Sequence, residues 1–351
     1  MKLKIAFVGA GPVSLLRAIS MAKQNPQDEI DIYDTAVKPG GAWQTKLSPE
    51  GHEIECGCHI WSFVPSVYEF IQAELGIALK PMHPAPQFAA KHLHIPYAWH
   101  NTLKSYAVLC RYLLQFNRKA IRNLQHVPAI NFKIFNKKNL YPEKGSGVLV
   151  DKLIEKIKQY PTIQIHLNST IDQIHLQTKP SLSVNGHFVE FNKIFLTSVS
   201  HIKKMRTATE EFEITRRKVN YVHFLISLNQ PAKRKISYLR MTNHQVVHRI
   251  TDISYQTNYR ENLLLVGIHE NAFNSMEEKE IEMAIHELLL KKRIINKTCE
   301  ISKADTFVYP TFYLSAESLN KLSQFNQTID VLRSTDLMHG IYFQLKSGLS
   351  I

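Results

Sequence analysis

Two glycines and a carboxylate near the N-terminus have the spacing of a nucleotide-binding loop. Gly9 and Gly11 follow the short apolar run 3–8, and Asp34 stands 25 positions after Gly9. Glycines let the backbone turn tightly and approach a pyrophosphate. A carboxylate at this spacing can accept hydrogen bonds from ribose hydroxyls. The chemistry indicated is the binding of a dinucleotide; a glycine-rich turn that binds nothing is the alternative.

The elements that must position these residues form a βαβ unit. The sequence predicts a buried strand over 3–8, a helix over 15–23 and a second strand over 29–34. The N-terminus of the helix presents free N–H groups and a positive dipole end to an anion. Pro12, Val13 and Ser14 lead into that helix and are predicted cofactor contacts. Ser14 replaces the usual third glycine, so helix and strand are expected to pack less closely.

A second glycine pair lies six residues after Asp34, in Gly40-Gly41-Ala42-Trp43-Gln44-Thr45. This run resembles the Gly-Gly-x-x-x-Thr element of flavoproteins in the amine-oxidase and UDP-galactopyranose-mutase superfamily. In that superfamily the element follows the ribose-binding carboxylate and wraps the FAD. The resemblance therefore implies FAD as cofactor. It also implies FAD contacts at Gly40, Gly41, Trp43 and Thr45, whereas Ala42 departs from the usual Arg or Asn.

A histidine with two nearby cysteines follows in Cys56-Gly57-Cys58-His59-Ile60-Trp61-Ser62. The segment resembles Tyr-Gly-x-His-Ile-Phe-His of the UDP-galactopyranose mutases and their relatives, in which the histidine lies beside the flavin ring. The resemblance implies that Gly57 contacts FAD and that His59 is a catalytic residue. A histidine buried in the core is the alternative. Cys56 and Cys58 lack the second pair that a zinc site needs, so no metal is expected.

The chain closes with features that resemble the same superfamily. Residues 142–145 resemble the Pro-x-x-Gly turn that returns the chain to the cofactor domain. The last expected strand is followed by Ser334-Thr335-Asp336 and a helix from about 337. By resemblance, backbone N–H groups of Asp336 and Leu337 face the flavin, although the usual glycine-rich turn is missing there.

The expected architecture is α/β, with a Rossmann-like FAD-binding domain of the GR2 type. We expect this domain to be discontinuous, with a helical insert over 63–140 and a sheet-containing substrate domain over 204–327. The three parts assigned to the FAD domain are 1–62, 141–203 and 328–351.

Composition favours an intracellular globular protein with an anionic partner. The 351 residues include 44% apolar and 21% charged types and carry a net charge of +13, which excludes wholesale disorder. Four cysteines do not make a disulfide scaffold. No apolar run reaches the ~18 residues of a membrane span, so a cytoplasmic protein is expected. The stretch 101–158 has twelve basic and three acidic residues, and within it Arg118 and Arg122 are predicted to contact a phosphorylated substrate.

Three functions fit these observations. The first is an FAD enzyme acting on a nucleotide-sugar or other phosphorylated small molecule, as UDP-galactopyranose mutases do. The second is a flavin oxidase or dehydrogenase of the amine-oxidase type. The third is a non-catalytic protein that keeps the FAD fold and binds nucleic acid or a protein partner. A small anionic substrate is expected under the first, with no nucleic-acid partner.

Overall fold

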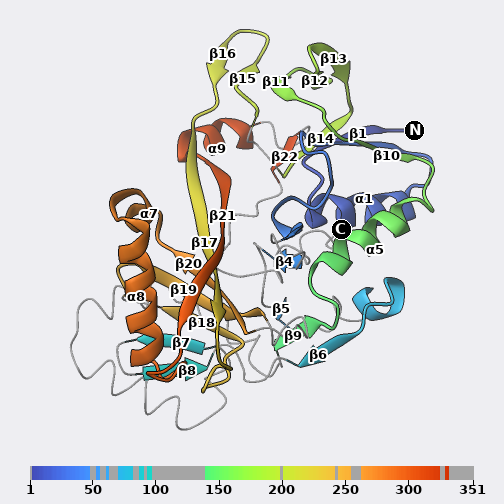
Figure 1. Ribbon diagram of the computed structural model, residues 1–351. Helices are drawn as coiled ribbons and strands as arrows, with labels where there is room; N and C mark the ends of the chain where they lie inside the picture. Colours follow the sequence, from blue (N-terminus) through green and yellow to red (C-terminus); the bar gives the residue numbers. More distant parts are fainter. Residues whose placement is uncertain are drawn as a thin grey trace, which may run out of the picture.

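The computed structural model describes most of the chain, in eleven stretches. These are residues 2–47, 53–55, 61–62, 70–81, 87–90, 93–96, 139–197, 201–241, 244–253, 262–324 and 329–331. The described strands form one seven-stranded sheet, two five-stranded sheets and two smaller sheets. Figure 1 shows the parallel five-stranded sheet and the seven-stranded sheet in separate lobes of the molecule.

A parallel five-stranded sheet organises the first lobe, in the order β10-β2-β1-β14-β22. Alternation along its strands decides which side each residue faces. Ile5 and Phe7 belong to the core under the helices, whereas Ala6 and Val8 belong to the core on the opposite face. The strands are β1 (Lys4–Val8), β2 (Glu29–Tyr33), β10 (Ile163–His166), β14 (Lys193–Leu196) and β22 (Ile329–Val331), and the helices are α1 (Pro12–Gln24) and α5 (Gly147–Ile157).

A second five-stranded sheet packs on the other face of the parallel sheet, in the order β13-β12-β11-β15-β16. The turn between β12 and β13 is formed by Asn185 and Gly186, whose φ angles of 50° and 85° suit a two-residue hairpin. The strands are β11 (Ile171–His175), β12 (Ser181–Val184), β13 (His187–Glu190), β15 (Lys204–Arg206) and β16 (Glu211–Glu213).

A seven-stranded sheet forms the second lobe, in the order β21-β17-β20-β19-β18-β7-β8. Helix α8 covers one of its faces with Ile281, Ile285, Leu288 and Leu289, as Figure 1 shows at the left. The strands are β7 (Gln87–Ala90), β8 (Leu93–Pro96), β17 (Arg216–Leu228), β18 (Tyr238–Met241), β19 (Val247–Asp252), β20 (Leu263–Ile268) and β21 (Ile301–Leu314), and the helices are α7 (Glu270–Ser275) and α8 (Glu278–Lys291).

Short elements connect the two lobes. In Figure 1, β4 and β5 lie between the parallel sheet and the face of the seven-stranded sheet opposite α8. Ile54 of β4 packs on that face with Leu225 and Leu265. The remaining elements are the single turns η1 (Gly41–Trp43) and η2 (Phe70–Glu74), the strands β3 (Thr45–Leu47), β4 (Glu53–Glu55), β5 (Trp61–Ser62), β6 (Leu79–Pro81) and β9 (Asn139–Pro142), and helix α9 (Ala316–Ser323).

The strands cross the domain limits expected from the sequence. Strands β7 and β8 lie within the expected helical insert 63–140, yet they pair into the seven-stranded sheet through β18. Strands β15 and β16 lie beyond residue 203, yet they pair with β11 in the first lobe. The part of the expected helical insert over 97–138 lies outside the described residues.

Among the helices that the structure describes, none has the length and apolar composition needed to span a membrane.

Candidate functional site

The loop after β1 leaves backbone exposed to a ligand. Gly9 has a φ of 104°, in the region that favours glycine, and its N–H donates to Tyr33 O at 2.7 Å. Gly11 occupies the N-cap position of α1. Among the described residues, no side chain accepts a hydrogen bond from the N–H groups of the first turn. A Cβ built on Gly11 would meet no described atom within 4 Å. The positive end of α1 therefore opens onto free space, as anion binding requires.

Asp34 ties this loop to the end of β2. Its Oδ2 accepts from the Ala10 N–H at 2.6 Å and its Oδ1 accepts from the Ala36 N–H at 2.8 Å. A carboxylate offers about four acceptor sites, so both oxygens can still accept from hydroxyl groups. The sequence placed Asp34 at this edge, and the structure brings it directly against the glycine loop.

Ser14 has a structural role that the sequence did not reveal. The side chain is fully buried, and its Oγ lies 2.7 Å from Thr197 Oγ1. Thr197 Oγ1 in turn donates to Val8 O at 2.9 Å, which leaves Ser14 as the donor to Thr197. The serine therefore links α1 to the end of β14, where the usual glycine would make no such bond.

The Gly-Gly element lies beside the same loop. The Gly40 N–H donates to Ala10 O at 2.8 Å, and a Cβ built on Gly41 would lie 3.8 Å from the Gly11 Cα. Gly40 and Gly41 have φ angles of 119° and 54°. At Gly40 a Cβ would also lie 3.1 Å from a methyl of Val150 on α5. These glycines are needed because the backbone turns tightly between α5 and the first glycine loop.

Trp43 and Thr45 pack against the protein itself. Trp43 is buried in the core under α1 and α5. Thr45 Cγ2 lies 2.9 Å from the position that a Cβ on Gly147 would occupy. Both side chains thus hold the Gly-Gly element against the start of α5.

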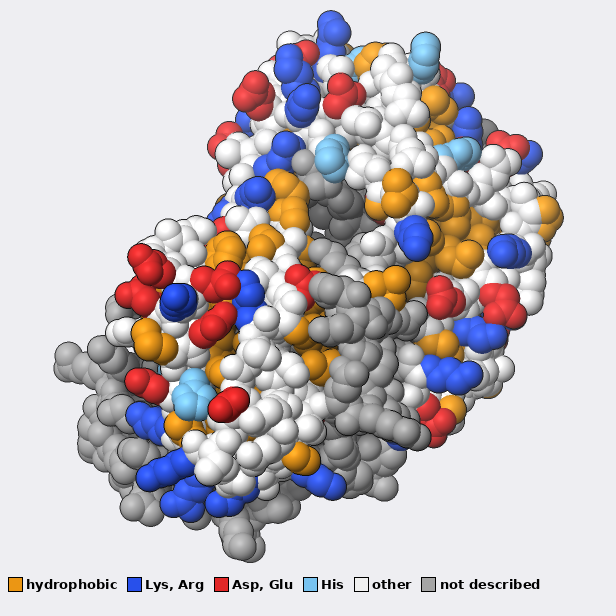
Figure 2. Space-filling view, viewed as in Figure 1, with side chains coloured by type: hydrophobic (Ala, Val, Ile, Leu, Met, Phe, Trp, Pro, Cys, Tyr) orange, Lys and Arg blue, Asp and Glu red, His pale blue; other side chains and the backbone are white. Residues whose placement is uncertain are grey.

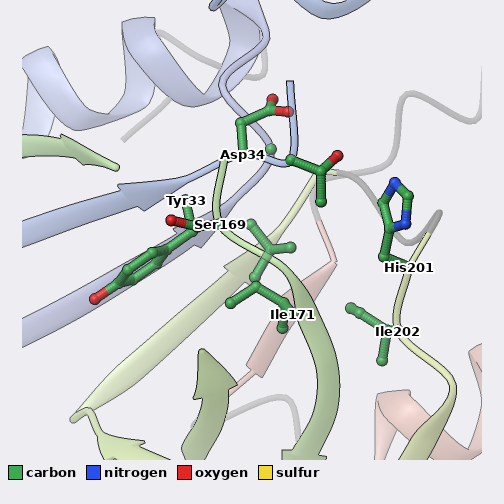
Figure 3. Close-up of a pocket in the computed structure, with 9 residues that line it drawn as sticks. Tyr33, Asp34, Ser169, Ile171, His201 and Ile202 are labelled. Atoms are coloured by element: carbon green, nitrogen blue, oxygen red, sulfur yellow. The ribbon is translucent and has the colours of Figure 1, made fainter. Parts of the chain in front are cut away.

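A small pocket opens at the carboxyl ends of β1 and β2, next to Asp34 (Figure 3). Tyr33 and Ser169 line one side of it, and His201 and Ile202 line the other. Ile171 lies between them and supplies an apolar floor. Ligands of open α/β sheets bind outside the carboxyl ends of the strands, and this pocket has that position. Sequence reasoning did not single out His201.

Glu55 has a buried carboxyl group and was not predicted from the sequence motifs as a site residue. It accepts from the Tyr141 hydroxyl and from the Ser146 N–H. Burial, together with Glu55, raises the pKa of Tyr141 well above its usual value. The Gly145 N–H donates to Pro142 O at 3.1 Å, which confirms the predicted turn. Glu55 thus joins β4 to this turn and to the start of α5.

Six of the predicted site residues lie outside the described residues. These are Gly57, His59, Arg118, Arg122, Asp336 and Leu337. Cys56 and Cys58 lie outside them as well. Within the described stretches, no group of three or more His, Cys, Asp or Glu side chains could hold a metal ion.

The face of the seven-stranded sheet opposite α8 carries a row of rings. The His223 ring stacks on Tyr309 with centroids 5.5 Å apart, and Tyr309 stacks on Tyr221 at 5.3 Å. At the end of the row, the hydroxyls of Tyr221 and Tyr313 lie 2.8 Å apart. Burial and the Tyr221 hydrogen bond raise the pKa of Tyr313. These rings lie on the same face as Leu225 and Phe307, which pack against Ile54.

Basic side chains continue that face toward β18. Arg240 and Arg249 are directly opposite each other in the β18–β19 pair. Arg249 also contacts His223 Nε2. Burial, with Arg249, His269 and Arg240 nearby, lowers the pKa of His248 well below its usual range. The face therefore concentrates positive charge next to the row of rings.

Sequence reasoning missed this face, although one signal for it was present. In the run 221–227, Val222, Phe224 and Ile226 alternate with Tyr221 and His223. Strand alternation places these two sets on opposite faces, so the sequence predicts a polar face on this strand. The sequence does not predict which residues of β19 and β21 lie beside it.

Comparison of the sequence with models of protein families and with curated proteins gives no match. Solved structures do match over almost the whole chain. A reduced UDP-galactopyranose mutase has a TM-score of 0.70 and 12% identity, covering 99% of this chain and 94% of its own. A putrescine oxidase bound to putrescine has a TM-score of 0.64 and 11% identity, covering 99% and 98%. An oxidoreductase from Methanosarcina mazei has a TM-score of 0.58 and 12% identity, covering 88% of each chain. The chain therefore has the fold of these proteins, which is the fold that its sequence motifs indicated.

Proposed function

We propose that the chain is an FAD-dependent enzyme that holds FAD along the carboxyl edge of the parallel sheet. The free space beside Gly11, at the uncapped start of α1, carries this proposal. A pyrophosphate needs close approach to backbone N–H groups and a positive dipole end, and this loop offers both. The Gly-Gly element lies beside it, at the distance given by Gly41 and the Gly11 Cα.

The nucleoside end of FAD is assigned to the pocket beside Asp34. Asp34 accepts ribose hydroxyls there, while its bonds to Ala10 and Ala36 keep the carboxylate in place. Ile171 and His201 provide an apolar surface and a ring for the base. The flavin end is assigned to Gly57, His59, Asp336 and Leu337, which remain expectations from the motifs.

The substrate is assigned to the face of the seven-stranded sheet opposite α8. We infer a phosphorylated small molecule, such as a nucleotide-sugar, because Arg240 and Arg249 stand opposite each other there. A bound phosphate could accept from both guanidinium groups. Arg118 and Arg122, the contacts expected from the charge distribution, remain a separate proposal.

This chain's own residues would orient the substrate and exclude water. Bound FAD supplies an electron acceptor or, when reduced, an electron-rich centre. Arg249 donates to His223 Nε2. That contact holds the Arg249 guanidinium against the sheet. The stacked rings of Tyr221 and Tyr309 form an apolar wall beside it.

The second candidate is an oxidase or dehydrogenase that acts on an uncharged or cationic substrate. The row of rings favours it, since aromatic faces bind apolar groups and cations. The two candidates differ in the expected role of Arg240 and Arg249. These arginines would bind a phosphorylated substrate but would repel a cationic one.

Binding of UDP to the reduced protein separates the candidates. We expect UDP to bind, and Arg240→Gln or Arg249→Gln to weaken it about ten- to a hundredfold, the effect of losing a charge-assisted hydrogen bond. Arg206→Gln, which removes an exposed arginine on β15, is the control. If UDP does not bind while an amine reduces the flavin, the oxidase candidate replaces the mutase-like one. If UDP binds equally well to all variants, the phosphate site lies elsewhere.

A further inference from the structure

A dense group of basic side chains lies at the foot of the second lobe, away from the proposed FAD site. It is formed by two segments, 231–235 before β18 and 291–297 after α8, which contain seven Lys or Arg and no Asp or Glu. The Arg234 N–H donates to Ile294 O and Gln230 Nε2 donates to Thr298 O, so the two segments lie side by side. Figure 2 shows the basic side chains gathered at the lower left, over this region. We call this group the basic foot; its members are Lys233, Arg234, Lys235, Lys291, Lys292, Arg293 and Lys297.

Five of the seven members of the basic foot are exposed to solvent. Within the described part of the chain, no ion pair is formed by its five exposed members. These are Lys233, Lys235, Lys291, Arg293 and Lys297. Elsewhere exposed lysines do find carboxylates, as Lys204 does with Glu211 at 2.6 Å. Among the described residues, these five exposed charges therefore have no carboxylate partner.

Two members of the basic foot occupy positions that are unfavourable for a basic residue. Lys292 is only 6% exposed, and burial, Lys291 and Arg234 lower its pKa. Arg293 has a φ of 55° at the position after the end of α8, where glycine is usual. The N–H groups of Arg293 and Ile294 donate to Leu290 O and Leu289 O, as in a Schellman motif. The dipole of a solvated helix favours basic residues in its last turn, which explains Lys291 but not the six members outside α8.

We infer that the basic foot docks the protein on an anionic lipid surface. A surface of headgroups offers many negative charges in one plane, and it attracts exposed Lys and Arg through the field alone. Four of the five exposed members are lysines, which act as point charges and do not select a planar partner. The two segments contain no aromatic residue on which a nucleic-acid base could stack. A lipid surface therefore fits better than a nucleic acid. This inference does not depend on the proposed function.

Vesicle binding tests the inference on the full-length protein. We expect co-sedimentation with vesicles of phosphatidylcholine and phosphatidylserine, and none with phosphatidylcholine alone. Each charge removed should lower the partition coefficient about fivefold, so Lys233→Gln/Lys235→Gln/Lys291→Gln should lower it by about two orders of magnitude. Added salt should release the wild-type protein, because the attraction is screened.

The matched control removes three exposed lysines elsewhere, in Lys158→Gln/Lys179→Gln/Lys218→Gln. It should bind vesicles nearly as well as the wild type, and circular dichroism should show both variants folded. Equal loss of binding in both triple variants would reduce the effect to net charge and overturn the inference. It would also be overturned by no binding to the anionic vesicles, or by foot-dependent binding to duplex DNA or RNA without vesicle binding.

Discussion

Single residues in the glycine loop divide into those that hold the loop and those that face a ligand. Ser14 is buried and hydrogen-bonded to Thr197, whereas Gly11 has open space beside its Cα. Asp34 does both, since it accepts from two backbone N–H groups and still has acceptor capacity toward the pocket. Substitutions at these positions should therefore affect stability and cofactor affinity in different proportions.

Asp34→Asn should weaken FAD binding by about ten- to a hundredfold, because a charged acceptor for ribose hydroxyls is lost. Titration of the apoprotein with FAD, followed by flavin fluorescence, measures the affinity. The control is Asp31→Asn on the same strand, which loses a 2.8 Å contact with His166. Equal affinities for the Asp34 and Asp31 variants would remove Asp34 from the site.

Ser14→Ala should lower the free energy of unfolding by about 1 kcal/mol, because the Thr197 hydroxyl loses its buried donor. Ser14→Gly should be less stable still, since glycine adds about 1 kcal/mol of cost within a helix. Urea unfolding gives both values. A Ser14→Gly protein more stable than the wild type would show that the motif's glycine packs better here than the serine.

Among the elements, the strand–turn–helix at the N-terminus was predictable because its signals are local. The run 3–8 corresponds to β1, and the predicted second strand over 29–34 corresponds to β2 (Glu29–Tyr33). The two-residue turn at Asn185 and Gly186 was predictable for the same reason, since its residue types require positive φ angles.

The substrate-side face was not predictable because its residues meet across long sequence separations. His223 and Tyr309 stack although 86 residues separate them, and Arg240 meets Arg249 through the register of β18 and β19. A shift of one residue in either pair would send these side chains to the opposite face. The alternation of polar and apolar residues can be seen in the sequence, but the register in which the strands pair cannot.

The hydrogen bond between Tyr141 and Glu55 at the junction of β4, β9 and α5 is expected to stabilise the fold. Tyr141→Phe should lower the free energy of unfolding by about 1.5–3 kcal/mol, because the buried Glu55 carboxyl group loses a donor. The matched control is Tyr33→Phe, a buried tyrosine on β2 in the same lobe. Urea denaturation of both variants makes the comparison. If both lose the same stability, the Glu55 hydrogen bond adds nothing beyond side-chain packing.

For the whole molecule, the histidines of the second lobe predict acid sensitivity. Burial lowers the pKa values of His244, His248 and His269. Below their ordinary pKa of about 6.5, the unfolded chain binds protons that the folded chain does not. The free energy of unfolding should therefore fall as the pH drops from about 7.5 to about 5.5.

His248→Gln should make that pH dependence shallower, because one depressed pKa is removed. Urea unfolding across the range measures the slope, which is independent of any packing loss that is the same at each pH. His187→Gln replaces an exposed histidine on β13 and should keep the wild-type slope. A His248→Gln slope as steep as the wild type would assign the acid sensitivity to other groups.

The absorption spectrum of the purified protein tests the central claim most directly. The glycine loop, Asp34 and the Gly-Gly element together predict a yellow protein with flavin bands near ~450 nm that dithionite bleaches. The chromophore released on denaturation should have the mass of FAD, and apoprotein should recover the bands on addition of FAD but not of FMN. A colourless protein that takes up no FAD on titration would contradict the account.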